Sequence, residues 1–122
     1  ELCSGKLICV FGCGGDRDRS KRPLMGAIAE KYCDEVIVTS DNPRSEDAEM
    51  IIDQIIAGMS NHCVVRRESD RRLAIALAVT SRRAHDVVVI AGKGHETTQT
   101  IGDQTVAFDD AAVAAEILAD LA

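Results

Sequence analysis

Short apolar runs recur along the chain, and each ends in a loop that is polar or rich in glycine. This pattern is typical of strands buried in a parallel sheet, where both faces are covered. The third run is the weakest because it is the shortest. The predicted strands are Lys6–Phe11, Glu35–Thr39, Cys63–Arg66 and Asp86–Ala91.

Stretches with apolar residues at helical spacing lie between these strands and at the end of the chain. Pro23 suits the first turn of the first helix. Ser45 and Ser69 are the expected N-caps of the second and third helices, and Asp109 or Asp110 that of the fourth. The side chains predicted to face the core are, helix by helix, Leu24, Met25, Ala27, Ile28 and Ala29; Ile51, Ile52, Ile55, Ile56 and Met59; Leu73, Ala76, Leu77 and Thr80; and Val113, Ala114, Ile117, Leu118 and Leu121.

Two further short strands, Thr97–Ile101 and Gln104–Phe108, flank Gly102-Asp103 and predict an antiparallel hairpin. Strands alternating with helices predict an α/β, Rossmann-like domain of three layers, with a mostly parallel sheet, helices on both faces and a C-terminal hairpin. A length of 122 residues suits one domain. Because the first strand begins almost at residue 1, we expect a domain cut from a larger protein.

Composition and charge exclude several classes of partner. The formal net charge is −6, which offers no field that attracts nucleic acid or an anionic membrane. The chain has two Phe, one Tyr and no Trp, too few aromatic side chains for base stacking. We therefore expect neither nucleic acid nor membrane as a partner. The basic pairs Arg66-Arg67, Arg71-Arg72 and Arg82-Arg83 are expected to be solvated surface.

The cysteines indicate a reducing compartment. The chain has five Cys but no C-x-x-C pair and no His or Cys at the spacing of a zinc site. An odd number without a disulfide framework favours free thiols in the cytoplasm. The apolar runs are too short to span a bilayer, and the N-terminus does not resemble a signal peptide.

The candidate chemistry lies in three loops that each follow a predicted strand. These loops are Gly12–Arg22, Ser40–Arg44 and Gly92–Glu96. In a parallel sheet they emerge at the carboxyl edge, where open α/β folds bind their ligands. Three polar loops on one edge are a stronger indication of a site than any one of them.

The first loop fits neither common nucleotide-binding motif. Arg17 stands where the dinucleotide motif G-x-G-x-x-G needs its third glycine, and no P-loop is present. The glycines by themselves are most simply explained by a tight turn. The charged residues between Asp16 and Arg22 favour contact with an anion or a zwitterion.

The other two loops supply groups that can bind an amino acid. Asp41-Asn42-Pro43-Arg44 is either a simple turn or a binding loop, in which Arg44 grips a carboxylate and Asp41 accepts from an ammonium. In the third loop, the glycines let the backbone approach a ligand and Glu96 offers a second anionic contact. His95 is a candidate general base, although a loop histidine is more often only a hydrogen-bonding group. Two arginines and two carboxylates on one edge predict a ligand that has both ammonium and carboxylate groups.

At these loops the chain resembles the Mur ligase family, and the match runs nearly end to end. The residues that carry it are Val10–Gly26, Asp41-Asn42-Pro43-Arg44 and Ala91–Glu96. D-N-P-R is the motif by which members of this family recognise meso-diaminopimelate, and members that add lysine depart from it, notably at the arginine. By this resemblance the chain, residues 1–122, is the C-terminal, amino-acid-binding domain of a three-domain enzyme.

The resemblance also implies roles for individual residues and for cofactors. Arg44 and Arg17 would hold carboxylate, and Glu96 and Asp41 would meet ammonium. ATP and Mg²⁺, bound mainly by a central domain, would convert UDP-N-acetylmuramoyl-L-alanyl-D-glutamate into an acyl phosphate that the amine of diaminopimelate attacks. This chain would hold no catalytic or metal-ligating residue and would not catalyse alone. The implied contacts with diaminopimelate are Arg17, Asp41, Asn42, Pro43, Arg44, Gly92 and Glu96.

Two other classes of protein stay open on the residues alone. One is a free-standing dinucleotide-binding Rossmann domain with Asp41 on a ribose, although Arg17 argues against it. The other is a non-catalytic module that binds an amino acid.

Overall fold

A parallel sheet forms the centre of the domain. The computed structural model describes residues 5–60, 63–93 and 96–121. Within this part of the chain the central sheet has the order β3-β2-β1-β4, and every neighbouring pair is parallel. The predicted strands are confirmed, with ends displaced by one residue. Their bounds are β1 Leu7–Phe11, β2 Glu35–Val38, β3 Val64–Arg67 and β4 Val87–Ile90.

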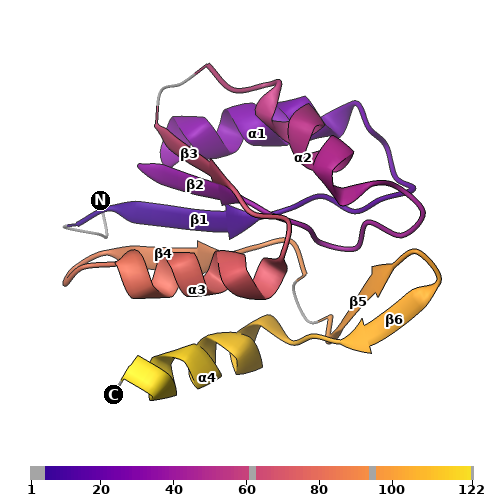
Figure 1. Cartoon of the computed structure of the whole chain (residues 1–122). Coiled ribbons are helices and arrows are strands. Elements are labelled where there is room, and N and C mark those ends of the chain that lie inside the picture. The colour runs from indigo at the N-terminus through magenta and orange to yellow at the C-terminus, as the bar shows by residue number, and fades with distance from the viewer. Residues whose placement is uncertain (1–4, 61–62, 94–95, 122) are drawn as a thin grey trace.

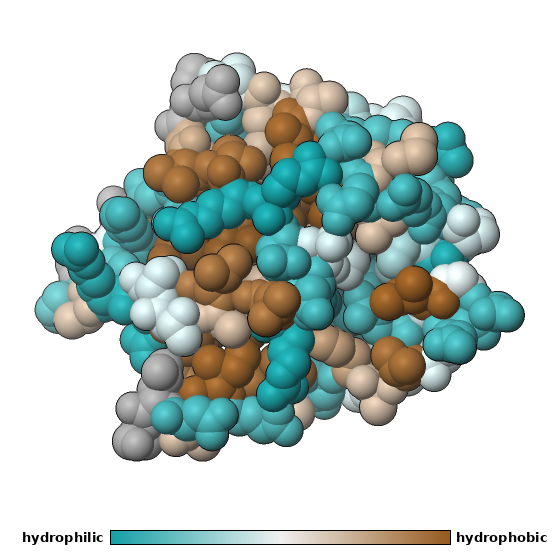
Figure 2. All heavy atoms as spheres, viewed as in Figure 1, coloured by the Kyte–Doolittle hydropathy of each residue, from teal (hydrophilic) through white to brown (hydrophobic). Residues whose placement is uncertain are grey.

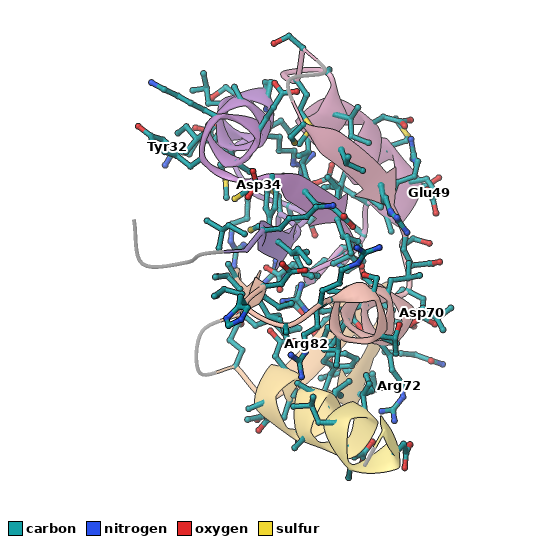
Figure 3. The ribbon with its side chains drawn as sticks, turned by 90° about the vertical axis from the view of Figure 1, so that its left-hand side faces the viewer. Tyr32, Asp34, Glu49, Asp70, Arg72 and Arg82 are labelled. Carbon is teal, nitrogen blue, oxygen red and sulfur yellow. The ribbon has the colours of Figure 1, made fainter. Side chains whose placement is uncertain are left out.

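Helices cover both faces of this sheet and complete the three predicted layers. Helices α1 and α2 lie on one face, and α3 and α4 on the other (Figures 1 and 3). The predicted hairpin forms a separate antiparallel pair near the carboxyl ends of the central strands. The bounds are α1 Lys21–Tyr32, α2 Ala48–Ile56, α3 Arg71–Ser81, α4 Asp110–Leu121, β5 Thr98–Ile101 and β6 Gln104–Ala107.

Alternation along the strands divides the apolar core between the two faces. Ile8, Val10 and Ile37 pack with α3 and α4, whereas Val36 and Val38 pack with α2. Both faces of β2 are therefore covered, which explains why its sequence is a continuous apolar run. In Figure 2 the end of the molecule that carries the loops after β1 and β2 is mostly hydrophilic.

Two of the predicted helix caps are wrong, and one is confirmed. Asp47, not Ser45, caps α2 by accepting from the Glu49 N–H at 2.9 Å, and Asp70, not Ser69, caps α3. In each case the helix begins later than expected, and a carboxylate stands at the capping position. Asp109 caps α4, as predicted.

The buried face of α1 is not the predicted apolar one. Leu24, Met25 and Ile28 are exposed, while Arg22 and Gly26 are buried. A Cβ at position 26 would overlap the backbone carbonyl of Ile55 in α2, so the two helices approach each other through the glycine. This close contact turns the apolar stripe of α1 outward.

The predicted face of α3 is also wrong, whereas those of α2 and α4 are largely right. Leu73 and Leu77 are exposed. Helix α3 starts with the buried Arg71, and the residues that follow it at helical spacing share its buried face. The buried apolar residues of α3 are Ala74, Ile75, Ala78 and Val79. The buried residues of α2 are Ile51, Ile52 and Ile55. On α4 Val113 is buried, Ala114 and Ile117 are half-buried, and Leu118 is exposed. The side chain of Leu121 lies outside the described residues.

Candidate functional site

The first two candidate loops are in direct backbone contact. The Gly15 N–H donates to the carbonyl of Asn42 at 2.7 Å. A Cβ on Gly15 would overlap the carbonyl of Pro43, and one on Gly12 would overlap that of Thr39. These glycines therefore allow two loops to pack edge to edge. This contact agrees with the expectation that the glycines themselves serve the backbone.

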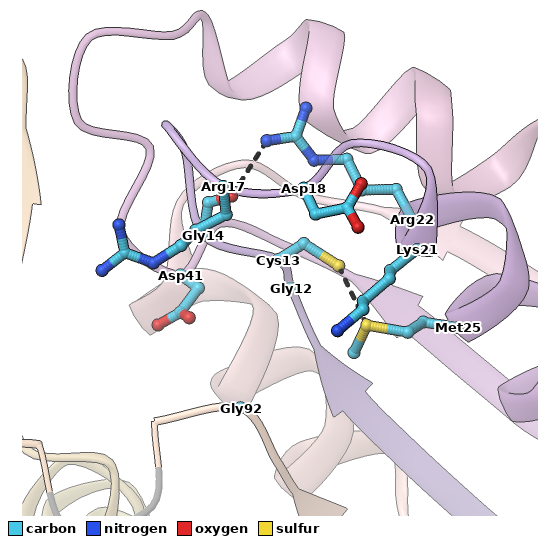
Figure 4. Close-up of a pocket in the computed structure, with 10 residues that line it drawn as sticks. All are labelled: Gly12, Cys13, Gly14, Arg17, Asp18, Lys21, Arg22, Met25, Asp41 and Gly92. Carbon is cyan, nitrogen blue, oxygen red and sulfur yellow. Dashed lines mark hydrogen bonds between the residues drawn. The ribbon is translucent and has the colours of Figure 1, made fainter.

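The third loop joins the first at Gly92. Gly92 has φ of +111°, a conformation that side chains strongly disfavour, and it lies next to the backbone of Gly12. Together the loops enclose an open cleft of about 350 Å³, whose lining includes Arg17, Lys21, Asp41 and Gly92 (Figure 4). Three of the seven predicted contact residues, Arg17, Asp41 and Gly92, thus line one cleft.

Arg17 and Arg44 approach the same backbone position. A Cβ on Gly14 would lie 3.0 Å from Arg44 Nη1 and 3.6 Å from Arg17 Cγ. Arg17 is exposed, and its Nη1 donates to the neighbouring Asp16 carbonyl at 3.2 Å. Arg44 Nη1 donates to the carbonyls of Gly15 at 3.0 Å and Asn42 at 3.3 Å. The Arg44 guanidinium and the side-chain stem of Arg17 therefore both lie against Gly14, which lines the cleft.

Asp41 places a carboxylate at the base of this cleft. Its side chain is buried, and Oδ1 lies 3.4 Å from Lys93 Nζ without a hydrogen-bond partner among the described residues. Burial raises the pKa of Asp41, and the positive charges of Lys93 and Arg71 oppose that rise. This oxygen is enclosed by protein and faces Lys93, so it is not open to the cleft.

Asn42 mainly connects the loops to one another. Its Oδ1 accepts from the backbone N–H of Thr100 at 2.8 Å, and its Nδ2 lies 3.5 Å from Glu96 Oε2. Asn42 and Pro43 are buried, whereas Glu96 is exposed at the rim. Gly94 and His95, including the candidate general base, lie outside the described residues.

The hairpin holds the Asp41–Arg44 loop, a role that sequence reasoning missed. The backbone N–H of Arg44 donates to Thr100 at 3.0 Å, and a parallel bridge pairs Arg44 with Ile101. The Gln99 amide donates to Ser40 Oγ at 2.8 Å and to the Asp41 carbonyl at 2.7 Å. The alternation of the strand shows only that Gln99 shares a face with Ile101, so it carries no signal for this contact.

Much of the charge between Asp16 and Arg22 serves the fold. Arg22 is buried, and its guanidinium bonds both carboxylate oxygens of Glu46, at 3.0 and 2.9 Å, together with Gln54 and the Gly14 carbonyl. The hydrogen bond from Arg22 is the largest of the effects that lower the pKa of Glu46 to about 2. Figure 4 shows the Arg22 guanidinium turned toward Gly14 and away from Lys21. Arg17 and Lys21 are the cations of this loop that line the cleft while exposed.

Arg71 corrects the expectation that the later basic pairs are solvated. Its side chain is fully buried and binds Asp110 of α4 through Nε at 2.8 Å and Nη2 at 2.7 Å. It also donates to the carbonyls of Ser40 at 2.9 Å and Ala91 at 3.1 Å. Arg71 therefore joins α3 and α4 to the carboxyl ends of two strands. Its neighbour Arg72 is exposed, as expected.

The described residues carry further observations on thiols, metals and membranes. Cys9, Cys13, Cys33 and Cys63 are free, and Cys3 lies outside the described part. Burial raises the pKa of Cys9 to about 12. Within the ranges that the structure describes, we find no group of three His, Cys, Asp or Glu side chains placed to hold a metal ion. No helix in the same ranges has the length and apolar character needed to cross a bilayer.

Fold and site together define the class of this domain. It is a parallel α/β domain with a charged ligand cleft built from three loops at the carboxyl edge of its sheet. Residues 1–94 match the family model of the Mur ligase, glutamate ligase domain. The chain belongs to this family.

Several known proteins that are similar to the chain share one name. The chain is 58% identical to UDP-N-acetylmuramoyl-L-alanyl-D-glutamate–2,6-diaminopimelate ligase of Syntrophomonas wolfei, over 97% of this chain and 24% of that protein. The ligase of the same name from Coxiella burnetii is 56% identical over 90% of this chain and 22% of its own length. A solved structure of a ligase with this name superposes with a TM-score of 0.94 at 43% identity, covering 98% of this chain and 25% of that one. The chain thus spans about a quarter of the length of these relatives.

Proposed function

We propose that the chain is the C-terminal, amino-acid-binding domain of a cytoplasmic ligase of peptidoglycan biosynthesis. The ligase would use ATP to add meso-diaminopimelate to UDP-N-acetylmuramoyl-L-alanyl-D-glutamate. Residues 1–122 would be the last of three domains. The shared name of relatives that match nearly the whole chain at 50–58% identity supports this proposal.

The observation that carries the proposal is a cleft lined by Arg17 and the buried carboxylate of Asp41, with the Arg44 guanidinium next to its wall at Gly14. Arg17 and Arg44 both approach Gly14, and Gly14, Arg17 and Asp41 line the same cleft. Diaminopimelate carries two carboxylates and two ammonium groups, so it needs complementary charges of both signs. Guanidinium groups suit carboxylates because they can donate two parallel hydrogen bonds.

In this proposal each predicted residue has a role at the ligand. Arg44 and Arg17 bind carboxylate, and Asp41 and Glu96 accept from ammonium. The remaining contacts, Asn42, Pro43 and Gly92, shape the wall of the site. By holding the amino acid in one orientation, the domain presents its amine to the activated substrate and lowers the entropic cost of the reaction.

ATP and Mg²⁺ would be held mainly by parts of the enzyme outside this chain and would activate the carboxylate of the nucleotide substrate. Lys21 is an exposed cation at the cleft and fits a polyphosphate anion that approaches as the domains close. The described residues offer no carboxylate cluster that would hold the metal from this side. The chain alone is then a specificity and positioning domain.

The test is amide formation by the full-length protein. With ATP, Mg²⁺ and the nucleotide substrate, we expect product with meso-diaminopimelate and little with L-lysine, measured by liquid chromatography and mass spectrometry. Equal use of both amino acids would refute the specificity. An absence of product with either would refute the ligase and favour a non-catalytic amino-acid-binding module. A change in NADH fluorescence on mixing would favour a dinucleotide-binding domain instead.

A further inference from the structure

Lys93 is a fully buried lysine at the junction of the three elements that form the site. It follows β4, and the relative exposure of its side chain is 0%. Its ammonium donates to the Thr98 carbonyl at 2.7 Å and to Asn42 Oδ1 at 3.4 Å. The ammonium also lies 3.4 Å from Asp41 Oδ1 and 6.0 Å from the centre of the Phe108 ring. One charge therefore links the loop after β4, the Asp41–Arg44 loop and the start of the hairpin.

Stability alone does not account for a lysine at this place. A buried ammonium loses its hydration, and an apolar side chain of similar volume is often as stable as a buried ion pair. The partners of Lys93 are also unusual, because two of the three polar groups belong to the loop predicted to contact the ligand. Both observations point to a role in the binding site.

Lys93 and Thr100 together determine which way the Asn42 amide faces. Lys93 Nζ and the Thr100 N–H both donate to Asn42 Oδ1, so this atom must be the oxygen. The amide nitrogen is thereby directed toward Glu96 Oε2, 3.5 Å away. In this way Lys93 acts on Glu96 through Asn42 and on Asp41 directly.

We propose that Lys93 is a positioning residue for the amino acid, because it orients the two carboxylates that meet the ammonium group. This inference rests on the proposed function and extends it to a residue buried behind the cleft. Lys93 does not touch the ligand. It sets the direction of the Asp41 carboxylate and, through Asn42, that of Glu96.

The charges around Asp41 provide a readout that a purely structural lysine would not move. Asp41 faces the cations Lys93 and Arg71, the anion Glu96 and the thiol of Cys13. Burial raises the pKa of Asp41, and Lys93 is the largest opposing effect. Without Lys93 the Asp41 pKa rises further, so the carboxylate becomes protonated at a higher pH. Binding of the ammonium then begins to fail at a higher pH as well.

The experiment compares Lys93→Met with wild type in the full-length protein, measuring initial rates from pH 5.5 to 9. We expect KM for diaminopimelate to rise at least about tenfold, and the acidic limb of the pH profile of kcat/KM to move to higher pH. KM values for ATP and for the nucleotide substrate should stay within about twofold. Lys31→Met is the matched control, because Lys31 is exposed on α1, and it should behave as wild type.

The results separate this inference from the proposed function. If the wild type prefers diaminopimelate but Lys93→Met leaves both its KM and the acidic limb unchanged, Lys93 is not a positioning residue. If the wild type shows no preference, the proposed function itself fails. If Lys93→Met does not fold, Lys93→Arg keeps the charge but cannot place it at the same point. We then expect a raised KM with an unmoved acidic limb, and a wild-type KM would overturn the inference.

Discussion

Replacing Arg44 with glycine separates the contribution of this residue to stability from its contribution to ligand binding. Arg44 has φ of +52°, in the left-handed region, where a side chain costs about 1–2 kcal/mol. Its Nη1 also donates to the carbonyls of Gly15 and Asn42, which we take as about 1 kcal/mol each. Arg44→Gly relieves the first effect and loses the second, so the two nearly cancel. Arg44→Ala keeps the strain and loses the hydrogen bonds.

For Arg44→Gly the magnitudes predict a small change in stability and a large loss of ligand binding. Arg44→Gly should change the free energy of unfolding by less than about 1 kcal/mol, whereas Arg44→Ala should destabilise by about 2 kcal/mol. A lost charged hydrogen bond to the ligand contributes about 1.5–3 kcal/mol, or roughly ten- to a hundredfold in kcat/KM. Lysine lacks the distal carboxylate of diaminopimelate, so its already low rate should fall much less.

The assay uses urea denaturation of the 122-residue chain and kinetics of the full-length protein with both amino acids. If Arg44→Gly is as stable as wild type yet loses activity equally with diaminopimelate and lysine, then Arg44 holds an end that both share. The selectivity argument would then be wrong. A large loss of stability in the glycine variant would instead show that the left-handed backbone is not strained.

Three further predictions concern the buried charges and the thiols. Asp110→Asn removes the ion-pair partner of the buried Arg71 and should destabilise the domain by about 3–5 kcal/mol in urea denaturation. Glu116→Gln breaks the exposed pair with Arg72 and should cost less than about 1 kcal/mol. The pKa of Glu46 is lowered from 4.5 to about 2, so the contribution of Glu46 to stability is complete above pH 4.5 and is lost as the pH falls toward 2. Glu46→Gln should therefore remove that part of the acid dependence of the melting temperature. Cys9 should remain a free thiol but react slowly with iodoacetamide at pH 8, because its pKa is raised to about 12; rapid labelling of Cys9 in the native protein, followed by mass spectrometry, would contradict this.

Local patterns in the sequence were sufficient for the order of the elements and for the location of the site. The apolar run of β2 is buried along its whole length because that strand is covered on both faces, whereas Val87 and Val89 of β4, at the edge of the sheet, are exposed. Parallel strands then require the loops after β1, β2 and β4 to emerge on one edge. The D-N-P-R motif needs no tertiary information, because it is a contiguous segment. Strands, fold class and family could therefore be predicted.

Tertiary contacts decided which side chains of those elements are buried. Helices α1 and α3 carry apolar residues on more than one side, so periodicity could not select the buried face. In α1 the choice depends on Gly26, which contacts a helix almost thirty residues away in the sequence. The burial of Arg22, Arg71 and Lys93 could not be predicted either, since charged residues are usually exposed and nothing in the local sequence marks an exception.

The assembly of the binding loop was likewise decided only in three dimensions. Its backbone pairs with a hairpin more than fifty residues later, and its carboxylate meets an ammonium from the loop after β4. These groups are brought together by the sheet, whose strand order places distant segments side by side. The sequence by itself determined which chemical groups stand at the carboxyl edge. The folded chain determined which of these groups bond to one another within the protein and which stay available to a ligand. The reason is that each buried charge must be paired with a group from elsewhere in the fold.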